Sequence, residues 1–539
     1  MSASTAKPAV NVLLLYPRFQ AGSFWNYRDA CELVGAKYPA PPLGLITVAA
    51  MLPDHWQPRL VDRNTDTLTP ADLAWADVVF TGGMLPQQSD TQTILRLCRE
   101  AGVPAVVGGP DATSGPEHYT DADFLVLGEA EGVIQDFVAA FERGARSGRF
   151  EAEKFKADVT TTPVPRFDLL DFDNYVEVNV QFSRGCPFTC EFCDIIELYG
   201  RKPRTKTSAQ ILNELQRLYD LGYRGHVDFV DDNLIGNKKA VKQFLPDLIA
   251  WQNAHGRPFE LSTEASLNLA DDPDLLEMMR QAGFFAIFIG IESPDPEVLV
   301  ATRKKQNTRR DIAASVHKVY EAGIFVVGGF IVGFDEESPQ VADEIAGLIE
   351  EAAIPVAMTG LLYALPTTQL TRRLAAQGRL HAEFDVADPD HEVGDQCTAG
   401  LNFETVRPRE EVLADYRKVV ERVYAPDAYF ARLRRLVDLL DMRGPNGDIF
   451  NARLGSDLKK LGRLVWGITR HWPEHRGPLW RMILYTLRTN PRALNPMLHM
   501  VALYVHLGPF SRFVSATIGK QIEEIEAGRW QSPALVAAE

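Results

Sequence analysis

Three cysteines fall close together in the chain, at Cys186, Cys190 and Cys193, with the spacing C-x3-C-x2-C. They directly follow a run of residues typical of a β-strand, so they begin a loop at the end of that strand. Three thiolates on one loop can bind one face of an iron–sulfur cube, which leaves the fourth iron without a protein ligand. Such an iron can chelate the amine and carboxylate of a substrate. A zinc site, which normally has four ligands, or three merely buried thiols are the alternatives, and the other three cysteines are remote in sequence.

Phe192 completes the longer pattern C-x3-C-x-aromatic-C. This pattern after the first strand of a barrel resembles the signature of radical S-adenosylmethionine (SAM) enzymes. The resemblance implies that the three cysteines hold a [4Fe-4S] cluster and that SAM binds its open iron. In that family the reduced cluster cleaves SAM to a 5'-deoxyadenosyl radical, which abstracts hydrogen from an unactivated carbon. It also implies an external electron donor such as a flavodoxin or ferredoxin.

Polar residues and glycines follow the later strands at the places where this family binds SAM. The resemblance implies SAM contacts from the aromatic residue of the motif and from seven strand-end residues: Phe192, Asp231, Asp232, Asn233, Glu264, Ser266, Glu292 and Gly333. The triplet Asp231-Asp232-Asn233 departs from the commoner Gly-Gly-Glu, so the role of each member stays open. The run Arg303-Lys304-Lys305 either contacts the SAM carboxylate through charge-assisted hydrogen bonds or is a solvated basic segment.

Residues 176–370 alternate strand-like and helix-like patterns. The strands and helices that these patterns predict must position the cysteines and the predicted SAM contacts. Six short apolar runs are the predicted strands: Val176–Phe182, His226–Val230, Glu260–Thr263, Phe285–Gly290, Phe325–Ile331 and Val356–Tyr363. Six βα units predict a (β/α)6 partial TIM barrel with its active site at the carboxyl ends of the strands.

Residues 1–145 show the same alternation, with five predicted strands at Val10–Tyr16, Arg59–Asp62, Val78–Thr81, Ala105–Val107 and Phe124–Leu127. This predicts a Rossmann-like (flavodoxin-like) parallel sheet. Glycines follow three of the strands, where they let a large ligand approach the backbone.

Such a domain ahead of a radical SAM barrel resembles the cobalamin-binding domain of the cobalamin-dependent class. The resemblance implies cobalamin contacts from the strand ends, at Thr81, Gly82, Gly83, Gly108, Gly109, Pro110, Gly128 and Glu129. The Asp-x-His-x-x-Gly motif of classical cobalamin carriers does not occur in residues 1–150, so the lower axial ligand of cobalt stays open. A flavodoxin-like scaffold that binds nothing is the alternative.

Residues 146–175, with Thr160-Thr161-Thr162-Pro163, are expected to be an extended linker. Residues 371–539 are expected to be a loop region followed by a mostly helical extension. The segment Glu197–Arg204 and this extension resemble a subgroup that includes hopanoid C-2 methylases. Aromatic and basic residues interleave in the extension, either to seat a lipid-like substrate or to pack the helices together: Trp466, Trp472, Trp480 and Tyr485 with Arg470, Arg476, Arg481 and Arg488.

The chain of 539 residues predicts about three domains. Its formal net charge of -16 argues against nonspecific nucleic-acid binding. Residues 451–539 hold twelve Lys and Arg against six Asp and Glu, a local charge of +6 that leaves -22 for the remainder. This basic tail predicts peripheral contact with a membrane or is a solvated helical face. Without a signal peptide or a spanning apolar run, a cytoplasmic protein is expected.

The resemblance as a whole implies a cobalamin-dependent radical SAM C-methyltransferase that acts on a small-molecule or lipid-like substrate. In that class one SAM methylates cobalt, and a second SAM supplies the radical that opens the substrate carbon to methyl transfer from methylcobalamin. The strand-end faces of the two α/β domains must then confront each other. Cyclisation, rearrangement or oxidation without methyl transfer is the alternative, and a corrinoid- or SAM-sensing regulator without turnover is a third interpretation.

Overall fold

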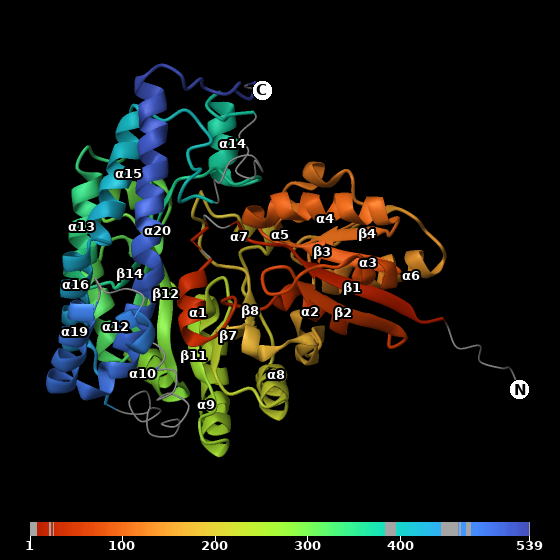
Figure 1. The fold of residues 1–539 in the computed structure, drawn as a ribbon, viewed down its shortest axis with the longest axis horizontal. Coiled ribbons are helices and arrows are strands. Elements are labelled where there is room, and N and C mark those ends of the chain that lie inside the picture. The colour runs from red at the N-terminus through yellow and green to blue at the C-terminus, as the bar shows by residue number, and fades with distance from the viewer. Residues whose placement is uncertain are drawn as a thin grey trace, which may run out of the picture.

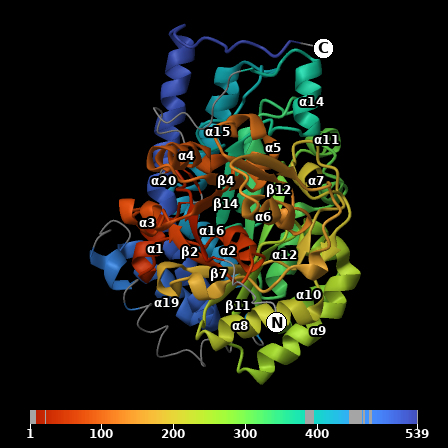
Figure 2. The ribbon, with the colours of Figure 1, turned by 90° about the vertical axis from the view of Figure 1, so that its right-hand side faces the viewer.

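The computed structural model describes residues 8–20, 23–24, 26–382, 395–443, 462, 465–470 and 476–537. Figure 1 shows an N-terminal α/β domain beside a second α/β domain, with long C-terminal helices against the far side of the second. Figure 2 shows the same molecule from the side of the N-terminal domain. The predicted α/β fold class with a mostly helical C-terminal region is confirmed.

The N-terminal domain is a six-stranded parallel sheet in the order β2-β1-β3-β4-β5-β6. Its strands are β1 (Val10–Tyr16), β2 (Trp56–Asp62), β3 (Val78–Gly82), β4 (Ala105–Gly108), β5 (Phe124–Leu127) and β6 (Gly148–Glu151). Its helices are α2 (Leu43–Ala50), α3 (Pro70–Trp75), α4 (Gln88–Ala101), α5 (Pro110–Ser114) and α6 (Ile134–Glu142). The first five strands have the flavodoxin-like order.

The central strand β1 shows why this segment is a continuous apolar run. Alternate side chains enter different cores because strand residues alternate between the two faces of a sheet. Leu13 and Leu15 pack with Ile94 of α4, whereas Val12 and Leu14 pack with Phe137 of α6. Helices therefore cover both faces of the sheet.

The second domain is a parallel sheet in the order β7-β10-β11-β12-β13-β14, with its first and last strands at opposite edges. The strands are β7 (Glu177–Val180), β10 (His226–Phe229), β11 (Glu260–Glu264), β12 (Phe284–Glu292), β13 (Phe325–Val332) and β14 (Val356–Leu361). The connecting helices include α8 (Ser208–Asp220), α9 (Lys238–Ala254), α10 (Pro273–Ala282), α12 (Ile312–Glu321) and α13 (Val341–Glu351). This is the partial barrel expected from six βα units.

The C-terminal helices close the β14 edge of this sheet. They are α15 (Arg409–Val423), α16 (Pro426–Leu439), α19 (Arg476–Thr489) and α20 (Leu494–Glu526). Tyr424 at the end of α15 donates a hydrogen bond to the Ala357 carbonyl of β14 at 2.8 Å. The helix α20 packs on α15 and on α1 (Arg28–Val34), which places the N-terminal region against the tail. Among the described helices, none has the length and apolar character needed to cross a bilayer.

Residues 146–175 hold more structure than the expected linker. Gly148–Glu151 forms β6, which pairs in parallel with β5 and extends the first sheet. The following residues contact the second domain, where Gln210 Nε2 of α8 donates to the Val159 and Thr162 carbonyls at 3.2 Å. At the end of the segment, the Tyr175 hydroxyl donates to Asp62 of β2 in the first domain at 2.9 Å. The residue ranges assigned to the separate domains stay a prediction.

Candidate iron–sulfur and cofactor site

The three motif cysteines lie in a loop held at its base by a short antiparallel ribbon. The ribbon pairs β8 (Ser183–Arg184) with β9 (Arg204–Thr205), and the loop ends in α7 (Ile195–Leu198). The Cys186 amide donates to the Gly200 carbonyl at 3.2 Å and so closes the loop on itself. Gly185 has φ +92°, and a Cβ there would lie 2.9 Å from the Gly200 carbonyl oxygen. Only glycine fits directly before Cys186.

The thiol groups are free and are buried or half-buried, and side-chain amides contact two of them. Asn233 Nδ2 lies 3.8 Å from Cys186 Sγ, and Gln306 Nε2 lies 3.7 Å from Cys190 Sγ. Burial raises the pKa of all three thiols, and for Cys193 the negative charge of Asp194 adds to the effect. Buried thiols with raised pKa values become thiolates when a metal replaces the proton. The N–H groups aimed at sulfur and the shared burial fit an iron–sulfur cluster.

Within the part of the chain that the structure describes, no group of three His, Cys, Asp or Glu side chains converges as ligands of a single ion do. A four-iron cube holds its three thiolates farther apart than one ion holds its ligands. The assignment of the cysteines as cluster ligands stays a prediction, and the loop geometry is what supports it.

The polar triplet Asp231-Asp232-Asn233 after β10 contacts the cysteine loop and its base. Asp231 accepts hydrogen bonds from the Ser183 hydroxyl at 2.5 Å and from the Ser183 amide. Asp232 accepts from the Gly185 amide at 2.6 Å, and Asn233 reaches Cys186. Burial raises the pKa of Asp231 to about 7 and that of Asp232 to about 6. Each member of the triplet therefore contacts the loop.

Glu264 ends β11 with an unsatisfied polar atom. Its Oε2 is buried and has no hydrogen-bond partner among the described residues. Burial, together with the charges of Asp228 and Asp231, raises the pKa of Glu264 well above its ordinary value. Nearby, Asn233 Nδ2 donates to Ser266 Oγ at 3.1 Å. An unpaired buried carboxyl oxygen is costly unless a ligand group meets it, so this strand end is a fitting place for a cationic amine.

A buried ion pair follows β12. Lys304 Nζ lies 2.5 Å from Glu292 Oε1, and the ammonium lies 5.9 Å from the centre of the Phe192 ring. Glu292 has φ +68°, a strained backbone conformation for a residue other than glycine, and the β12–β13 register shifts there. Of the basic run Arg303-Lys304-Lys305, only the middle residue is buried. The strained turn thus places one carboxylate and one ammonium beside the aromatic residue of the cysteine motif.

Gly333 directly follows β13 and is tightly packed. Its φ is +118°, and a Cβ there would lie 2.6 Å from Leu401 Cδ2. Its amide donates to both carboxyl oxygens of Glu337 at 2.9 Å, and burial raises the pKa of Glu337 to about 8. These contacts explain the glycine by packing, and its contact with SAM stays a prediction.

The glycines at the carboxyl edge of the first sheet form a shallow backbone cradle. A Cβ on Gly82 would lie 2.1 Å from the Gly108 carbonyl oxygen, so the ends of β3 and β4 approach this closely only because Gly82 lacks a side chain. Gly109 has φ +92° and is exposed, and Pro110 starts α5 directly after it. Thr81 Oγ1 is buried without a partner among the described residues. Exposed backbone and an orphan hydroxyl fit a large polar ligand such as a corrinoid.

The glycine cradle faces the cysteine loop. The helix α5, which continues from Gly109, contacts α7 at the end of the cysteine loop. Gly200 of that loop contacts the ring of Phe155, which lies after β6 of the first domain. The strand-end faces of the two domains are therefore in contact, as the two-SAM scheme requires.

Two segments match known families: residues 180–349 match the radical SAM superfamily, and residues 368–520 match a domain of unknown function, DUF4070. A Synechocystis protein named as an uncharacterized methyltransferase is 42% identical over 544 residues, covering 98% of this chain and 99% of its own. The hopanoid C-2 methylase of Rhodopseudomonas palustris is 38% identical over 438 residues, covering 80% of each chain. The chain belongs to the cobalamin-binding radical SAM enzymes, in the subgroup that includes hopanoid C-2 methylases.

A solved structure shares the fold of this radical SAM enzyme over nearly its whole length. The cobalamin-dependent SAM radical enzyme OxsB, with aqua-cobalamin and S-adenosylmethionine bound, matches with a TM-score of 0.58. The match covers 97% of this chain and 82% of OxsB at 14% sequence identity. At that identity the likeness concerns the fold alone.

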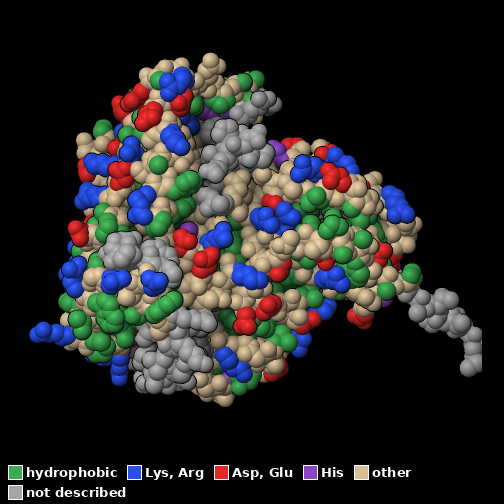
Figure 3. All heavy atoms as spheres, viewed as in Figure 1, with side chains coloured by type: hydrophobic (Ala, Val, Ile, Leu, Met, Phe, Trp, Pro, Cys, Tyr) green, Lys and Arg blue, Asp and Glu red, His purple; other side chains and the backbone are tan. Residues whose placement is uncertain are grey.

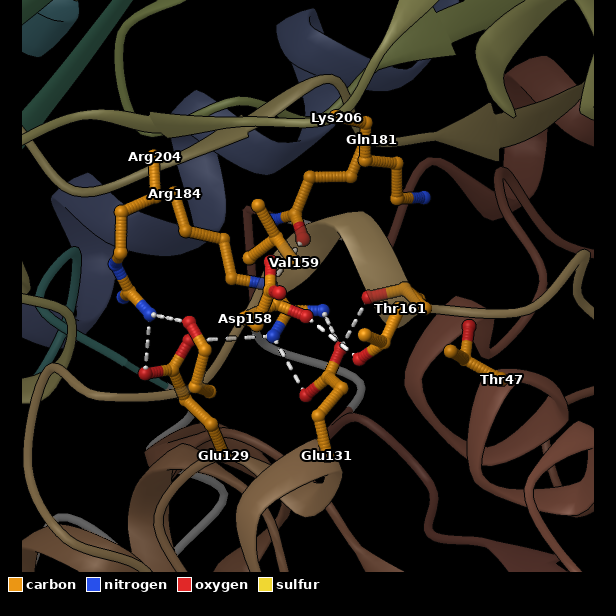
Figure 4. Close-up of polar contacts among 12 residues, drawn as sticks. Thr47, Glu129, Glu131, Asp158, Val159, Thr161, Gln181, Arg184, Arg204 and Lys206 are labelled. Carbon is orange, nitrogen blue, oxygen red and sulfur yellow. Dashed lines mark hydrogen bonds and ion pairs between the residues drawn. The ribbon is translucent and has the colours of Figure 1, made fainter. Parts of the chain in front are cut away.

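In this radical SAM enzyme, a buried ion-pair network joins the first domain to the cysteine loop (Figure 4). Arg184 Nη1 and Nη2 lie 2.9 and 2.8 Å from the Glu131 carboxyl oxygens. Glu129 lies 3.3 Å from Arg184 and 2.8 Å from Arg204. Both glutamates have only 4% of their side chains exposed. Gly128 is exposed beside them, but the Glu129 carboxylate is already engaged by two arginines, so its contact with cobalamin stays a prediction.

The sequence does not mark two residues at the site of this radical SAM enzyme, Arg184 and Gln306. Lys304 belongs to the predicted basic run, but the sequence alone does not separate it from its two neighbours. Gln306 lies in a short 3-10 turn and contacts Cys190 across the barrel mouth. No pattern in the local sequence marks such a residue, because its role comes from the turn that follows the fourth unit.

Proposed function

We propose that this protein is a cobalamin-dependent radical SAM C-methyltransferase that methylates an unactivated carbon of a small, lipid-like substrate. The observation that carries the proposal is the contact between α7 of the cysteine loop and α5, which directly follows the glycine cradle, in a chain 38% identical to a hopanoid C-2 methylase. The faces that would hold cobalamin and the cluster, between which a methyl group must pass, lie against each other.

The cysteine loop would hold the cluster through Cys186, Cys190 and Cys193. When bound, the [4Fe-4S] cluster supplies the electron that cleaves SAM, and cobalamin supplies methyl transfer. The protein groups around the loop bind and orient. Asn233 and Gln306 donate N–H groups toward sulfur, and such hydrogen bonds tune a cluster's reduction potential.

SAM would lie between β11 and β12, where an anionic and a cationic group face the loop. The Glu264 carboxylate would accept hydrogen bonds from the SAM amino group, which would satisfy its orphan oxygen. The Lys304 ammonium, fixed by Glu292, would donate to the SAM carboxylate. The Phe192 ring would exclude water from one side. These contacts, with those of Asp231, Asp232, Ser266 and Gly333, stay proposals.

Replacing Lys304 by methionine is expected to weaken SAM binding about 10-fold to 100-fold while the cluster still assembles. The variant keeps the length of the side chain but removes the donor, and a charged hydrogen bond contributes about 1.5–3 kcal/mol. Equilibrium binding of SAM to the reconstituted protein measures the effect. Lys305→Met is the matched control, because the adjacent Lys305 side chain is exposed. Equal affinity in both variants would remove Lys304 from the SAM site.

The first domain would bind cobalamin along the cradle formed by Gly82, Gly83, Gly108 and Gly109. Backbone groups without side chains allow the nucleotide part of a corrinoid to pass close to the sheet. The Thr81 hydroxyl would find its partner there. Because α5 contacts α7, a corrinoid in this cradle would face the loop that holds the cluster.

The lipid-like substrate and a peripheral membrane contact of a cytoplasmic protein belong to the same proposal. Trp480, Leu484 and Leu487 lie along one face of α19 and have 46%, 66% and 48% of their surface exposed. Figure 3 shows hydrophobic side chains gathered at α19 with Lys and Arg around them. Exposed aromatic and aliphatic groups beside arginines favour an anionic bilayer surface. Trp472 of the aromatic set lies outside the described residues, and Tyr485 bonds to Asp438 at 2.8 Å.

Incubation with methyl-labelled SAM tests the reaction class. Extracts of a deletion strain, separated into lipid and aqueous fractions, supply the unmethylated substrate. We expect the reconstituted enzyme with cobalamin and a reductant to place label in a lipid-fraction product and to form 5'-deoxyadenosine. Formation of 5'-deoxyadenosine without labelled product in either fraction would favour cyclisation, rearrangement or oxidation instead. Absence of both products would favour a sensor without turnover.

A further inference from the structure

A hollow of about 420 Å³ opens on the surface beside the cysteine loop. Pro187 and Phe188, which lie between Cys186 and Cys190 in the chain, form one wall. A Cβ on Gly236 would lie 3.0 Å from Pro203 Cγ and 3.2 Å from Pro187 Cδ, so the walls meet at this glycine. The other lining residues are Lys202, Ile235, Asn237, Lys238 and Asn268. One wall of the hollow therefore starts at the residue next to Cys186, a predicted cluster ligand.

The rim of the hollow is basic although the chain carries a net charge of -16. Lys202 and Lys238 line it, and their chain neighbours Arg201 and Lys239 are exposed. In the described part of the chain, neither Lys202 nor Lys239 forms an ion pair with a carboxylate.

The acidic residues near this rim are already paired. Asp272 lies 2.8 Å from Lys242 and 4.0 Å from Lys238, and Asp271 lies 2.7 Å from Arg310. The carboxylates of the neighbouring loop are thus shared among three cations. A net positive charge remains at the rim.

Two of these cations lie at the N-terminus of a helix, where the helix dipole disfavours positive charge. Lys238 and Lys239 are the first residues of α9, and its first turn holds no acidic residue. The helix is capped by Asn237, whose side chain accepts from the Ala240 amide at 3.2 Å. The positive end of the helix dipole repels a cation by about 0.3–1 kcal/mol. Lys238 is compensated by a hydrogen bond to the Asn268 carbonyl at 3.0 Å and by Asp272, whereas the Lys239 side chain is exposed. An exposed cation placed where it lowers stability is typical of functional surfaces.

We propose that this basic hollow is the docking site of an acidic one-electron carrier protein of the flavodoxin type. The proposal rests on the proposed function, because each SAM cleavage consumes one external electron. One electron leaves the reduced carrier, which becomes oxidised by one electron, and is consumed as one sulfonium C–S bond of SAM breaks. An acidic carrier seated on Lys202, Lys238 and Lys239 would lie over Pro187 and Phe188, two half-buried residues of the cysteine loop.

A comparison of two reductants distinguishes a defect in docking of the carrier from a defect in SAM cleavage. The reconstituted full-length enzyme cleaves SAM with either reduced flavodoxin or dithionite, and 5'-deoxyadenosine is counted. In the double variant Lys202→Glu with Lys239→Glu, we expect kcat/KM for flavodoxin to fall about 10-fold at low salt, and this difference to shrink as salt is added. The rate with dithionite should stay unchanged. The control is Arg96→Glu with Lys520→Glu, two exposed cations on α4 and α20, which should leave both rates as in the wild type.

Direct binding provides a readout independent of turnover. Titration of oxidised flavodoxin into wild-type protein should show saturable binding that the Lys202→Glu, Lys239→Glu variant weakens and the control does not. Binding that the variant leaves unchanged would overturn the proposal. An equal loss of rate with both reductants in the variant would also overturn the proposal. The same holds if the wild-type enzyme cleaves SAM with dithionite but not with flavodoxin. No cleavage with dithionite would reject the proposed function itself, while the titration would still test the docking site.

Discussion

Alanine at Cys186, Cys190 or Cys193 is expected to abolish assembly of the four-iron cluster and, with it, all cleavage of SAM. Two thiolates do not hold a cube that already has one iron without a protein ligand. The described surroundings offer side-chain amides near sulfur, from Asn233 and Gln306, which donate hydrogen bonds and do not replace a thiolate. Iron and acid-labile sulfide per chain, measured after anaerobic reconstitution, should fall close to zero in each variant.

Cys98→Ala is the matched control for these three variants. Cys98 is also a free and buried cysteine, with 1% of its surface exposed, but it packs in the core of the first domain. The control should bind iron as the wild type does. Full iron content in any of the three motif variants would contradict the assignment, and so would an equal loss in the control.

The architecture could be predicted because parallel strands covered on both faces are continuous apolar runs. Val10–Tyr16 is such a run, and the structure has β1 with those bounds. The strand β6 could not be predicted in this way. Gly148–Glu151 lies at the sheet edge with Arg149 and Glu151 exposed, so it has no apolar run, and its backbone pairing with β5 is what makes it a strand.

The candidate site could be predicted only as far as local spacing reaches. The cysteines share one short loop, so their grouping was readable from the sequence. The bond from the Gly185 amide to Asp232 spans 47 residues, and the pair Lys304–Glu292 depends on a strained turn with φ +68° at Glu292. Such contacts follow from sheet register and turn geometry. For the same reason, a glutamate next to the predicted cobalamin cradle, Glu129, proved to bind two arginines of the other domain.

Removal of the Arg184 side chain is expected to loosen the contact between the two α/β domains. Only 14% of that side chain is exposed, and Arg184→Ala leaves the Glu131 carboxylate buried with no cation beside it. Breaking a buried pair from one side costs about 3–5 kcal/mol. For a chain of this length we expect the thermal midpoint to fall by roughly 3–4 °C. Because Arg184 precedes Gly185 and Cys186, reconstituted iron should also be lost faster than in the wild type.

The pH dependence of this loss distinguishes the ion pair from ordinary packing. Burial alone would raise the pKa of Glu131, but the hydrogen bonds and charge of Arg184 outweigh it and lower that pKa to about 2. In the wild type the pair therefore stabilises the fold fully at every pH above the ordinary pKa of a glutamate, and this stabilisation declines as the pH falls below that value until it is lost below about pH 2. In the variant burial dominates and raises the pKa of Glu131, so the penalty is full at about pH 7 and shrinks as the pH falls and Glu131 takes up a proton.

Comparison with an exposed pair of the same chemistry completes this test. Arg149 and Glu151 lie 2.9 Å apart with 53% and 51% of their side chains exposed, and such pairs contribute about 0–1 kcal/mol. Arg149→Ala should therefore barely move the thermal midpoint at either pH. If Arg184→Ala were equally mild, or if its effect were the same at about pH 5 as at about pH 7, the buried network would not join the domains by charge. The cysteine loop would then have to be positioned by its backbone bonds to Asp231, Asp232 and Gly200 alone.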